Sequence, residues 1–177
     1  MCGNGIKCLV VDKSGLRVRP LAIMTGASSS EVIFYRSVFR HGVDEKRRVM
    51  IPAKWRSSRP DVEYTLILWP NGGQADACLL VLPPARMLAL AEKIAGMSSA
   101  DPQAQSLRRL IGAKSAGASL DKGGRILIPD DMAAKTGIEK ESVLVGLVDR
   151  FEIWNPERYE SANAVDVALL PEAFKLI

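Results

Sequence analysis

The chain has 177 residues, of which 47% are hydrophobic and 25% charged, and its formal net charge is +4. This length suits one domain or two small ones, and the apolar content excludes a chain that is disordered throughout. Apolar runs such as Ala77–Leu82 are too short to cross a membrane. The three cysteines include no C-x-x-C pair, which argues against a zinc cluster and favours a reducing, cytoplasmic compartment.

The first elements are expected after an unusual leader. Residues 1–31 contain scattered glycines and a run of serines, so we expect them to form a poorly ordered extension. Val32–Phe39 and Val49–Ile51 are rich in β-branched and aromatic residues, which favours strands. The polar segment Asp44–Arg48 is the loop that joins them. A proline follows the second strand and predicts a short helix over Ala53–Arg56.

Helical patterns lie further along the chain. Apolar residues recur at helical spacing over Pro84–Ala95 and Ala104–Ile111. Another short helix is expected over Asp130–Thr136, because two aspartates suit its start and Gly137 suits its end. A tail with the apolar segment Val165–Leu170 follows.

The sequence contains an internal repeat. Residues 44–52 read DEKRRVMIP and residues 121–129 read DKGGRILIP, with Asp, Arg, Ile and Pro at identical offsets. Downstream, YTLILW at 64–69 parallels SVLVGL at 142–147, and ACLLVLP at 77–83 parallels RFEIWNP at 150–156. This ordered agreement predicts a duplicated unit with a turn, a short strand, a segment that starts with proline, and two further strands.

Positive charge gathers around both copies of the Asp-x-x-x-Arg loop. Basic residues outnumber acidic ones from Arg36 to Arg59 and again from Leu107 to Arg125, whereas the residues after Arg125 are more acidic. A polyanion is one partner that suits such a distribution, and a solvated charged surface is the alternative.

The two loops have a chemistry that supports binding to DNA. Each begins with an aspartate, Asp44 or Asp121, that can accept backbone N–H hydrogen bonds and fix a tight turn. The arginines at the far ends, Arg48 and Arg125, can then fork onto phosphate oxygens or guanine. For one loop alone, a plain Asp–Arg salt bridge is the simpler interpretation. Two copies in matched contexts, each within a basic region, favour DNA binding.

Longer segments of the chain resemble a known family. They are HGVDEKRR at 41–48 with IPAKWR at 51–56, LDKGGRILIP at 120–129, and LVGLVDRFE at 144–152 with IWNPERY at 153–159. These segments resemble the MraZ family of bacterial regulators, whose halves belong to the AbrB-like swapped-hairpin superfamily. The resemblance covers about residues 32–160.

The resemblance implies an α+β, β-rich fold. Two tandem AbrB-like swapped-hairpin subdomains would be related by pseudo-twofold symmetry, with helices between and after them. The expected divisions are an N-terminal extension (1–31), a first repeat (32–83), a helical connector (84–112), a second repeat (113–160) and a C-terminal tail (161–177).

The resemblance also implies a cytoplasmic, nucleoid-associated transcriptional regulator. Such a protein would form a homo-oligomeric ring and bind short direct repeats of double-stranded DNA in the promoter of the division and cell-wall gene cluster. An antitoxin-like or protein-interaction module of the same superfamily is the alternative. The residues expected to contact DNA are Lys46, Arg47, Arg48, Lys122 and Arg125, and those expected to shape the loops are Asp44, Asp121 and Gly124.

The first loop departs from the family pattern, in which glycine immediately precedes the motif arginine. Gly124 keeps this glycine, whereas Arg47 replaces it. Either the first loop is reshaped, or it accepts backbone strain and presents an extra cation. The chain lacks a nucleophile motif and a complete phosphate-binding loop, and it has a single histidine. We therefore expect no enzymatic activity, catalytic residue, cofactor, metal site or small-molecule substrate.

Overall fold

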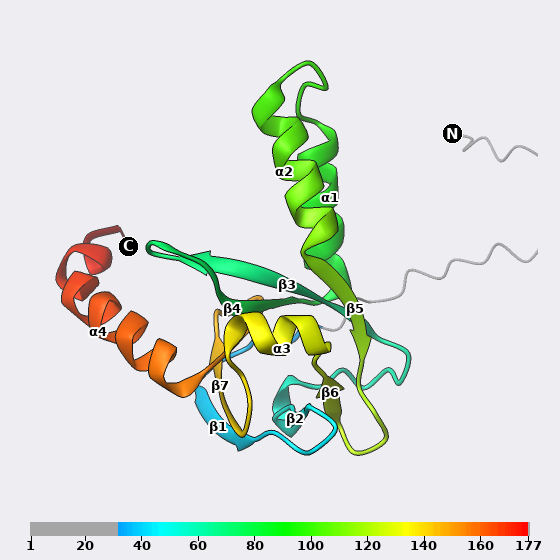
Figure 1. Ribbon diagram of the computed structural model, residues 1–177, viewed down its shortest axis with the longest axis vertical. Coiled ribbons are helices and arrows are strands. Elements are labelled where there is room, and N and C mark those ends of the chain that lie inside the picture. Colours follow the sequence, from blue (N-terminus) through cyan, green and yellow to red (C-terminus); the bar gives the residue numbers. More distant parts are fainter. Residues whose placement is uncertain (1–31, 177) are drawn as a thin grey trace, which may run out of the picture. The chain divides into compact units, whose positions relative to one another are not determined.

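The computed structural model describes residues 32–176, so the expectation for the extension at 1–31 lies outside the described residues. The described part is α+β and rich in strands (Figure 1). Its elements are β1 (Val38–Gly42), β2 (Arg48–Met50), the 3₁₀ turn η1 (Ala53–Trp55), β3 (Glu63–Asn71), β4 (Gln74–Leu82), α1 (Pro84–Ala95), α2 (Pro102–Ala113), β5 (Ser115–Ser119), β6 (Arg125–Leu127), α3 (Asp130–Thr136), β7 (Glu141–Gly146), β8 (Phe151–Trp154), α4 (Pro156–Ala173) and the 3₁₀ turn η2 (Phe174–Leu176).

Six strands form one antiparallel sheet in the order β1-β7-β8-β4-β3-β5. Strands β1 to β4 come from the first copy of the sequence repeat, and β5 to β8 come from the second. In the sheet, β1 corresponds to β5, β3 to β7 and β4 to β8. When each strand is exchanged for its counterpart in the other copy, the strand order is unchanged except that it is read from the opposite edge of the sheet. The outer strand of each copy pairs with the hairpin of the other copy, β1 with β7 and β5 with β3. Neither copy therefore completes its part of the sheet alone.

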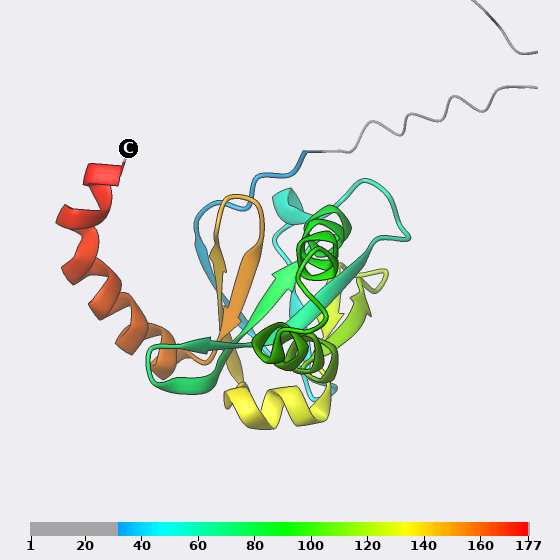
Figure 2. The same cartoon turned by 90° about the horizontal axis from the view of Figure 1, so that it is seen from above.

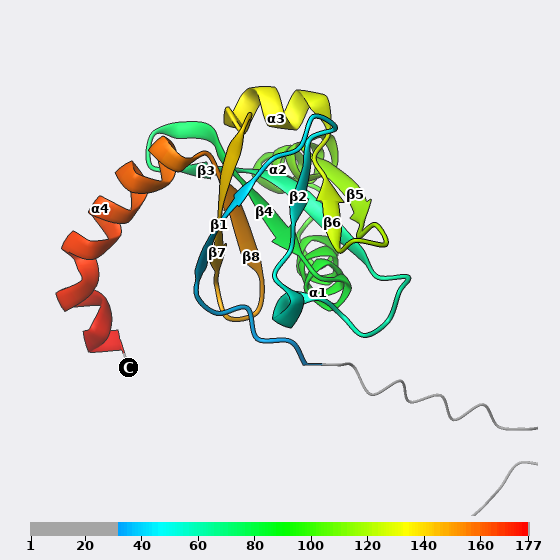
Figure 3. The same ribbon diagram turned by 90° about the horizontal axis from the view of Figure 1, so that it is seen from below.

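Strands β2 and β6 lie side by side as a separate antiparallel ribbon, with one strand from each copy (Figures 1 and 3). Val49 and Ile126 are opposite each other in this ribbon, and both are fully buried. Burying such an aliphatic side chain contributes about 1.5–3 kcal/mol. Because successive strand residues point to opposite faces, Arg48 and Arg125 lie on the outer face of the ribbon.

The core joins the ribbon to the sheet. Val49 and Ile126 belong to the same buried cluster as the sheet residue Phe151. Trp55, from η1, is fully buried beside Phe151, with ring centroids 5.2 Å apart. Its indole Nε1 donates a hydrogen bond to the Arg36 carbonyl oxygen at 3.2 Å. The segment after β2 thus inserts its tryptophan into the core and fixes the ribbon over the sheet.

The helices lie around this sheet (Figures 1 and 2). Helices α1 and α2 form a hairpin that projects from the sheet on the side away from β2 and β6 (Figure 1). Helix α3 packs against β4 and ends at Gly137, whose φ of 68° is left-handed. Helix α4 begins at the N-cap Asn155 and extends away from the sheet (Figure 2). Among the described residues, no helix is long and apolar enough to span a bilayer.

The structure corrects some of the expected boundaries. The strand predicted over Val32–Phe39 is wrong, since β1 is Val38–Gly42 and the earlier residues form only an isolated bridge at Tyr35. Ser37 has a φ of 80°, which interrupts the extended backbone that a continuous strand needs. The helix expected over Ala53–Arg56 is only a 3₁₀ turn, whereas α1 and α3 have the expected bounds.

Candidate functional site

The first Asp-x-x-x-Arg loop is a compact turn built around Asp44. Its carboxylate Oδ1 accepts hydrogen bonds from the backbone N–H groups of Lys46 and Arg48, both at 2.9 Å. Its own N–H donates to the Arg48 carbonyl oxygen at 3.1 Å, and Arg47 N–H donates to the Asp44 carbonyl oxygen at 2.8 Å. One short side chain thereby holds the entire turn, as aspartate commonly does in loops.

The second loop repeats this arrangement around Asp121. Its Oδ1 accepts hydrogen bonds from the N–H groups of Gly123 at 2.8 Å and Arg125 at 2.9 Å. Asp121 N–H donates to the Arg125 carbonyl oxygen, and Gly124 N–H donates to the Asp121 carbonyl oxygen, both at 2.8 Å. The sequence repeat is thus also a repeat of backbone hydrogen bonds.

The residue before each motif arginine has a left-handed backbone in both loops. Gly124 has a φ of 77° and Arg47 has a φ of 55°. Of the two alternatives for the first loop, the structure shows that it keeps the backbone shape of the second loop and accepts the strain. The Arg47 side chain then forms an ion pair with Asp130, at the start of α3.

The two loops are also linked crosswise to the other copy. Ile51 N–H donates to the Gly124 carbonyl oxygen, and Ile128 N–H donates to the Arg47 carbonyl oxygen, both at 3.0 Å. A Cβ at Gly124 would lie 2.2 Å from Cζ of Arg56, so the Arg56 guanidinium covers this glycine. From the sequence, Arg56 lies in a segment that resembles the family and Asp130 at an expected helix start, but neither residue is predicted to contact a loop. Each of these two side chains contacts a loop of the other copy, and no local sequence pattern indicates such a contact.

The motif arginines and aspartates meet on the outer face of the ribbon as one ion-pair cluster: Asp44, Arg48, Asp121 and Arg125. Within each loop, arginine Nη2 lies close to aspartate Oδ2, at 2.7 Å for Arg48–Asp44 and 2.9 Å for Arg125–Asp121. Between loops, Arg48 Nη1 lies 3.2 Å from Asp121 Oδ2, and Arg125 Nη1 lies 3.5 Å from Asp44 Oδ2. The Asp–Arg salt bridge considered for each loop is therefore present in the structure. Further salt bridges join the loops of the two copies.

These contacts favour the charged form of both aspartates. The side-chain hydrogen bond from Arg48, followed by the backbone hydrogen bond from the same residue, lowers the pKa of Asp44 to about 2. The backbone hydrogen bond from Arg125 is the largest cause that lowers the pKa of Asp121. Both carboxylates stay ionised at neutral pH, so the cluster has no net charge there.

The remaining basic side chains of the loops are more accessible. Lys46 and Lys122 are exposed, and among residues 32–176 neither ammonium group forms an ion pair. Lys54 is also exposed and lies 4.7 Å from the centre of the Phe39 ring. The two loops thus combine a neutral ion-pair cluster with one exposed lysine each, Lys46 and Lys122.

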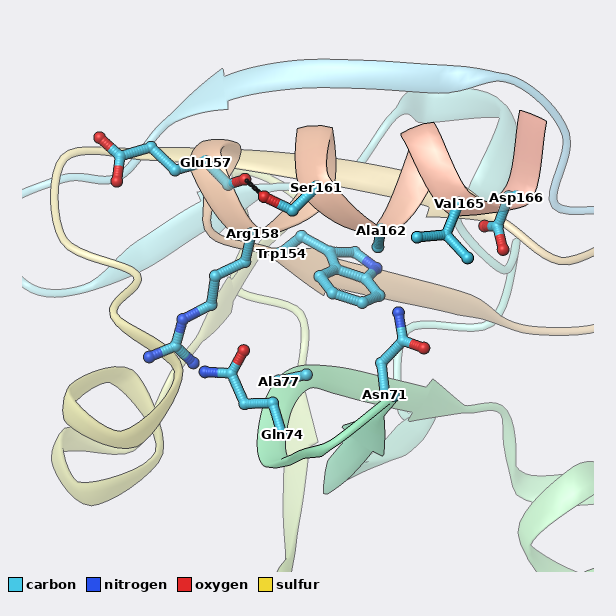
Figure 4. A pocket seen from close by; sticks show the side chains of 11 residues that line it. Asn71, Gln74, Ala77, Trp154, Glu157, Arg158, Ser161, Ala162, Val165 and Asp166 are labelled. Carbon is cyan, nitrogen blue, oxygen red and sulfur yellow. Dashed lines mark hydrogen bonds between the residues drawn. The ribbon is translucent and has the colours of Figure 1, made fainter. Parts of the chain in front are cut away.

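A pocket of about 420 Å³ lies elsewhere, between the β3–β4 turn and α4 (Figure 4). Trp154, Ala162 and Val165 line its apolar side, and Gln74 and Arg158 line its polar side. Arg158 Nη1 already donates to the carbonyl oxygens of Asp76 and Lys135, at 2.8 and 3.0 Å. Within the described residues, no group of three or more His, Cys, Asp or Glu side chains is placed to hold a metal ion.

The fold and the loops define a class of protein with tandem repeats that share one sheet and one ribbon. A sequence model described as "MraZ protein, putative antitoxin-like" matches residues 113–168. The transcriptional regulator MraZ of Thermomicrobium roseum is 35% identical over 122 residues, which cover 68% of this chain and 81% of that protein. The transcriptional regulator MraZ of Alcanivorax borkumensis is 32% identical over 135 residues, which cover 74% of this chain and 90% of that protein.

A third relative, the transcriptional regulator MraZ of Symbiobacterium thermophilum, is 35% identical over 121 residues, which cover 68% of this chain and 83% of that protein. The chain belongs to the MraZ family of transcriptional regulators, which is not a family of enzymes. Membership implies the AbrB-like fold, in agreement with the mixed α+β architecture.

Proposed function

We propose that the chain is a transcriptional regulator that binds double-stranded DNA through the outer face of the β2–β6 ribbon and its two loops. The observation that carries this proposal is the matched pair of Asp-centred turns, which present basic residues from both copies on one face. The names of the relatives as transcriptional regulators support it. Short direct repeats in a promoter are the proposed targets, with the division and cell-wall gene cluster as the proposed locus.

The proposed architecture behind this face is a pair of AbrB-like swapped hairpins related by pseudo-twofold symmetry. The strand order that is unchanged when the copies are exchanged supports it. So does the pairing of each outer strand with the hairpin of the other copy. The first repeat would occupy 32–83 and the second 113–160, with α1 and α2 in the connector at 84–112. The proposed tail at 161–177 begins within α4.

We also propose a homo-oligomer that closes as a ring and acts in the cytoplasm at the nucleoid. A closed ring needs two different patches that meet between neighbouring copies. Helix α4 offers one apolar surface, because Val165 and Leu169 lie four residues apart on the same face and are each more than half exposed. A ring would present several loop pairs to spaced repeats and so raise affinity through multivalency.

Titration of fluorescent DNA from upstream of the chain's own gene tests the proposal. Anisotropy is expected to report tighter binding to this DNA than to a shuffled duplex, with affinity falling linearly as salt rises on logarithmic axes. The test variant is Lys46→Ala with Lys122→Ala. Its matched control, on the distant α1–α2 hairpin, is Lys93→Ala with Arg109→Ala. Weaker DNA binding by the test variant but not by the control supports the proposal. Equal affinity of the parent for both duplexes refutes it.

The family description as antitoxin-like supports a second candidate, a module that binds another protein. The α1–α2 hairpin would be its surface, since Leu88 and Leu110 are exposed on it. Purification from the native host separates the candidates. The second candidate would be favoured if the chain does not bind DNA and instead co-purifies with a stoichiometric protein partner. The substitution Leu88→Ser should then abolish binding of that partner.

A further inference from the structure

The ion-pair cluster raises the question of which loop residues contact DNA and which position the others. The Asp-x-x-x-Arg pattern suggests that its arginines are the contacts. In the structure both guanidinium groups are already engaged by two carboxylates each, at nitrogen–oxygen distances of 2.7 to 3.5 Å. Their exposed fractions are 27% for Arg48 and 34% for Arg125.

The net charge of the ion-pair cluster also argues against the two arginines as DNA contacts. Two arginines and two ionised aspartates sum to zero, so the cluster attracts a polyanion weakly. An arginine that turned toward a phosphate would leave its aspartate beside that phosphate, and like charges held close together repel. The aspartates cannot turn away as well, because each holds two backbone N–H groups of its loop.

The lysines have the opposite properties. Lys46 is the third residue of the first loop and Lys122 is the second residue of the other. Both are exposed, and neither takes part in an ion pair among the described residues. Their backbones belong to turns that the aspartates hold rigid. A flexible ammonium on a fixed turn suits a phosphate contact.

We infer that Arg48 and Arg125 are positioning residues, which with Asp44 and Asp121 clamp the two loops at a fixed separation, and that Lys46 and Lys122 supply the phosphate contacts. This inference rests on the proposed binding of DNA. The clamp joins the copies, because each arginine reaches the aspartate of the other loop. DNA would therefore meet a preorganised pair of loops rather than two independent ones.

Replacing both aspartates tests the clamp. Asp44→Asn with Asp121→Asn removes two negative charges and frees both arginines, while the asparagine oxygens can still accept the turn hydrogen bonds. If the arginines were the contacts, the more positive variant would bind as tightly or more tightly. The inference predicts the reverse, a loss of affinity on the order of tenfold. Circular dichroism and light scattering establish that fold and assembly persist.

The salt dependence of binding tests the lysines. Lys46→Ala with Lys122→Ala is expected to lower the slope of log affinity against log salt by about 2, since each lost phosphate contact lowers it by about 0.9. The Lys93→Ala with Arg109→Ala control should keep the parent slope. The side chains replaced in both variants are exposed, so the substitutions should not disturb folding. An unchanged slope for the lysine variant, or equal or tighter binding by the asparagine variant, overturns the inference. A parent that does not bind DNA overturns the proposed function instead.

Discussion

Gly124→Ala is the most informative single change, because two separate costs meet at this position. A residue with a side chain pays about 1–2 kcal/mol for the left-handed backbone that Gly124 adopts with a φ of 77°. The added Cβ would also lie 2.2 Å from Cζ of Arg56 and must displace that guanidinium. Arg56 Nε then loses its hydrogen bond to the Ile51 carbonyl oxygen, now 2.7 Å long.

A hydrogen bond from a charged donor contributes about 1.5–3 kcal/mol, so the total expected loss for Gly124→Ala is about 2.5–5 kcal/mol. Arg56→Ala alone should lose only the hydrogen-bond part, about 1.5–3 kcal/mol. The double variant should be no less stable than Gly124→Ala, because the displaced guanidinium is already gone. The sum of the two single losses of unfolding free energy should therefore exceed the loss of the double variant by the whole contribution of the hydrogen bond.

Urea unfolding followed by circular dichroism measures this overlap in a double-mutant cycle at one protein concentration. Equal m-values across the four proteins show that the transitions are comparable. If the single losses add within about 0.5 kcal/mol, the two residues are not coupled and the assigned packing of Arg56 on Gly124 is refuted.

Three further predictions concern the loops and α4. Arg47→Gly should leave the free energy of unfolding within about 1 kcal/mol of the parent, since relief of left-handed strain offsets an exposed ion pair with Asp130; a larger loss in urea unfolding contradicts this. Because the folded-state pKa of Asp44 is lowered to about 2, its stabilisation should be complete above its unfolded pKa of about 3.9 and be lost as pH falls toward 2. Urea titrations at stepped pH should then show a shallower acid loss for Asp44→Asn, and parallel curves would refute the assignment. Val165→Ser with Leu169→Ser should reduce the mass measured by light scattering, whereas the exposed control Ala164→Ser should not; equal masses would exclude α4 from assembly.

The sequence was most informative where the signal was local and periodic. The bounds of α1 and α3 follow from helical spacing and from terminal residues such as Pro84 and Gly137. The strand expected at Val32 failed because β-branched composition does not report a positive φ at Ser37. Lys46 and Lys122 could be named from the sequence, but their roles as phosphate contacts stay a prediction.

The sequence by itself determined that two copies of one unit exist and that aspartate begins each loop, because identical offsets impose the same local hydrogen bonds. Only the tertiary structure decided how the copies combine. It paired β1 with β7 and β5 with β3, brought the two loops onto one ribbon, and joined Arg48 to Asp121. It also placed Arg56 over Gly124 and Asp130 beside Arg47. The physical reason is that these partners are far apart in the chain, and burial of both copies in one core is what brings them together.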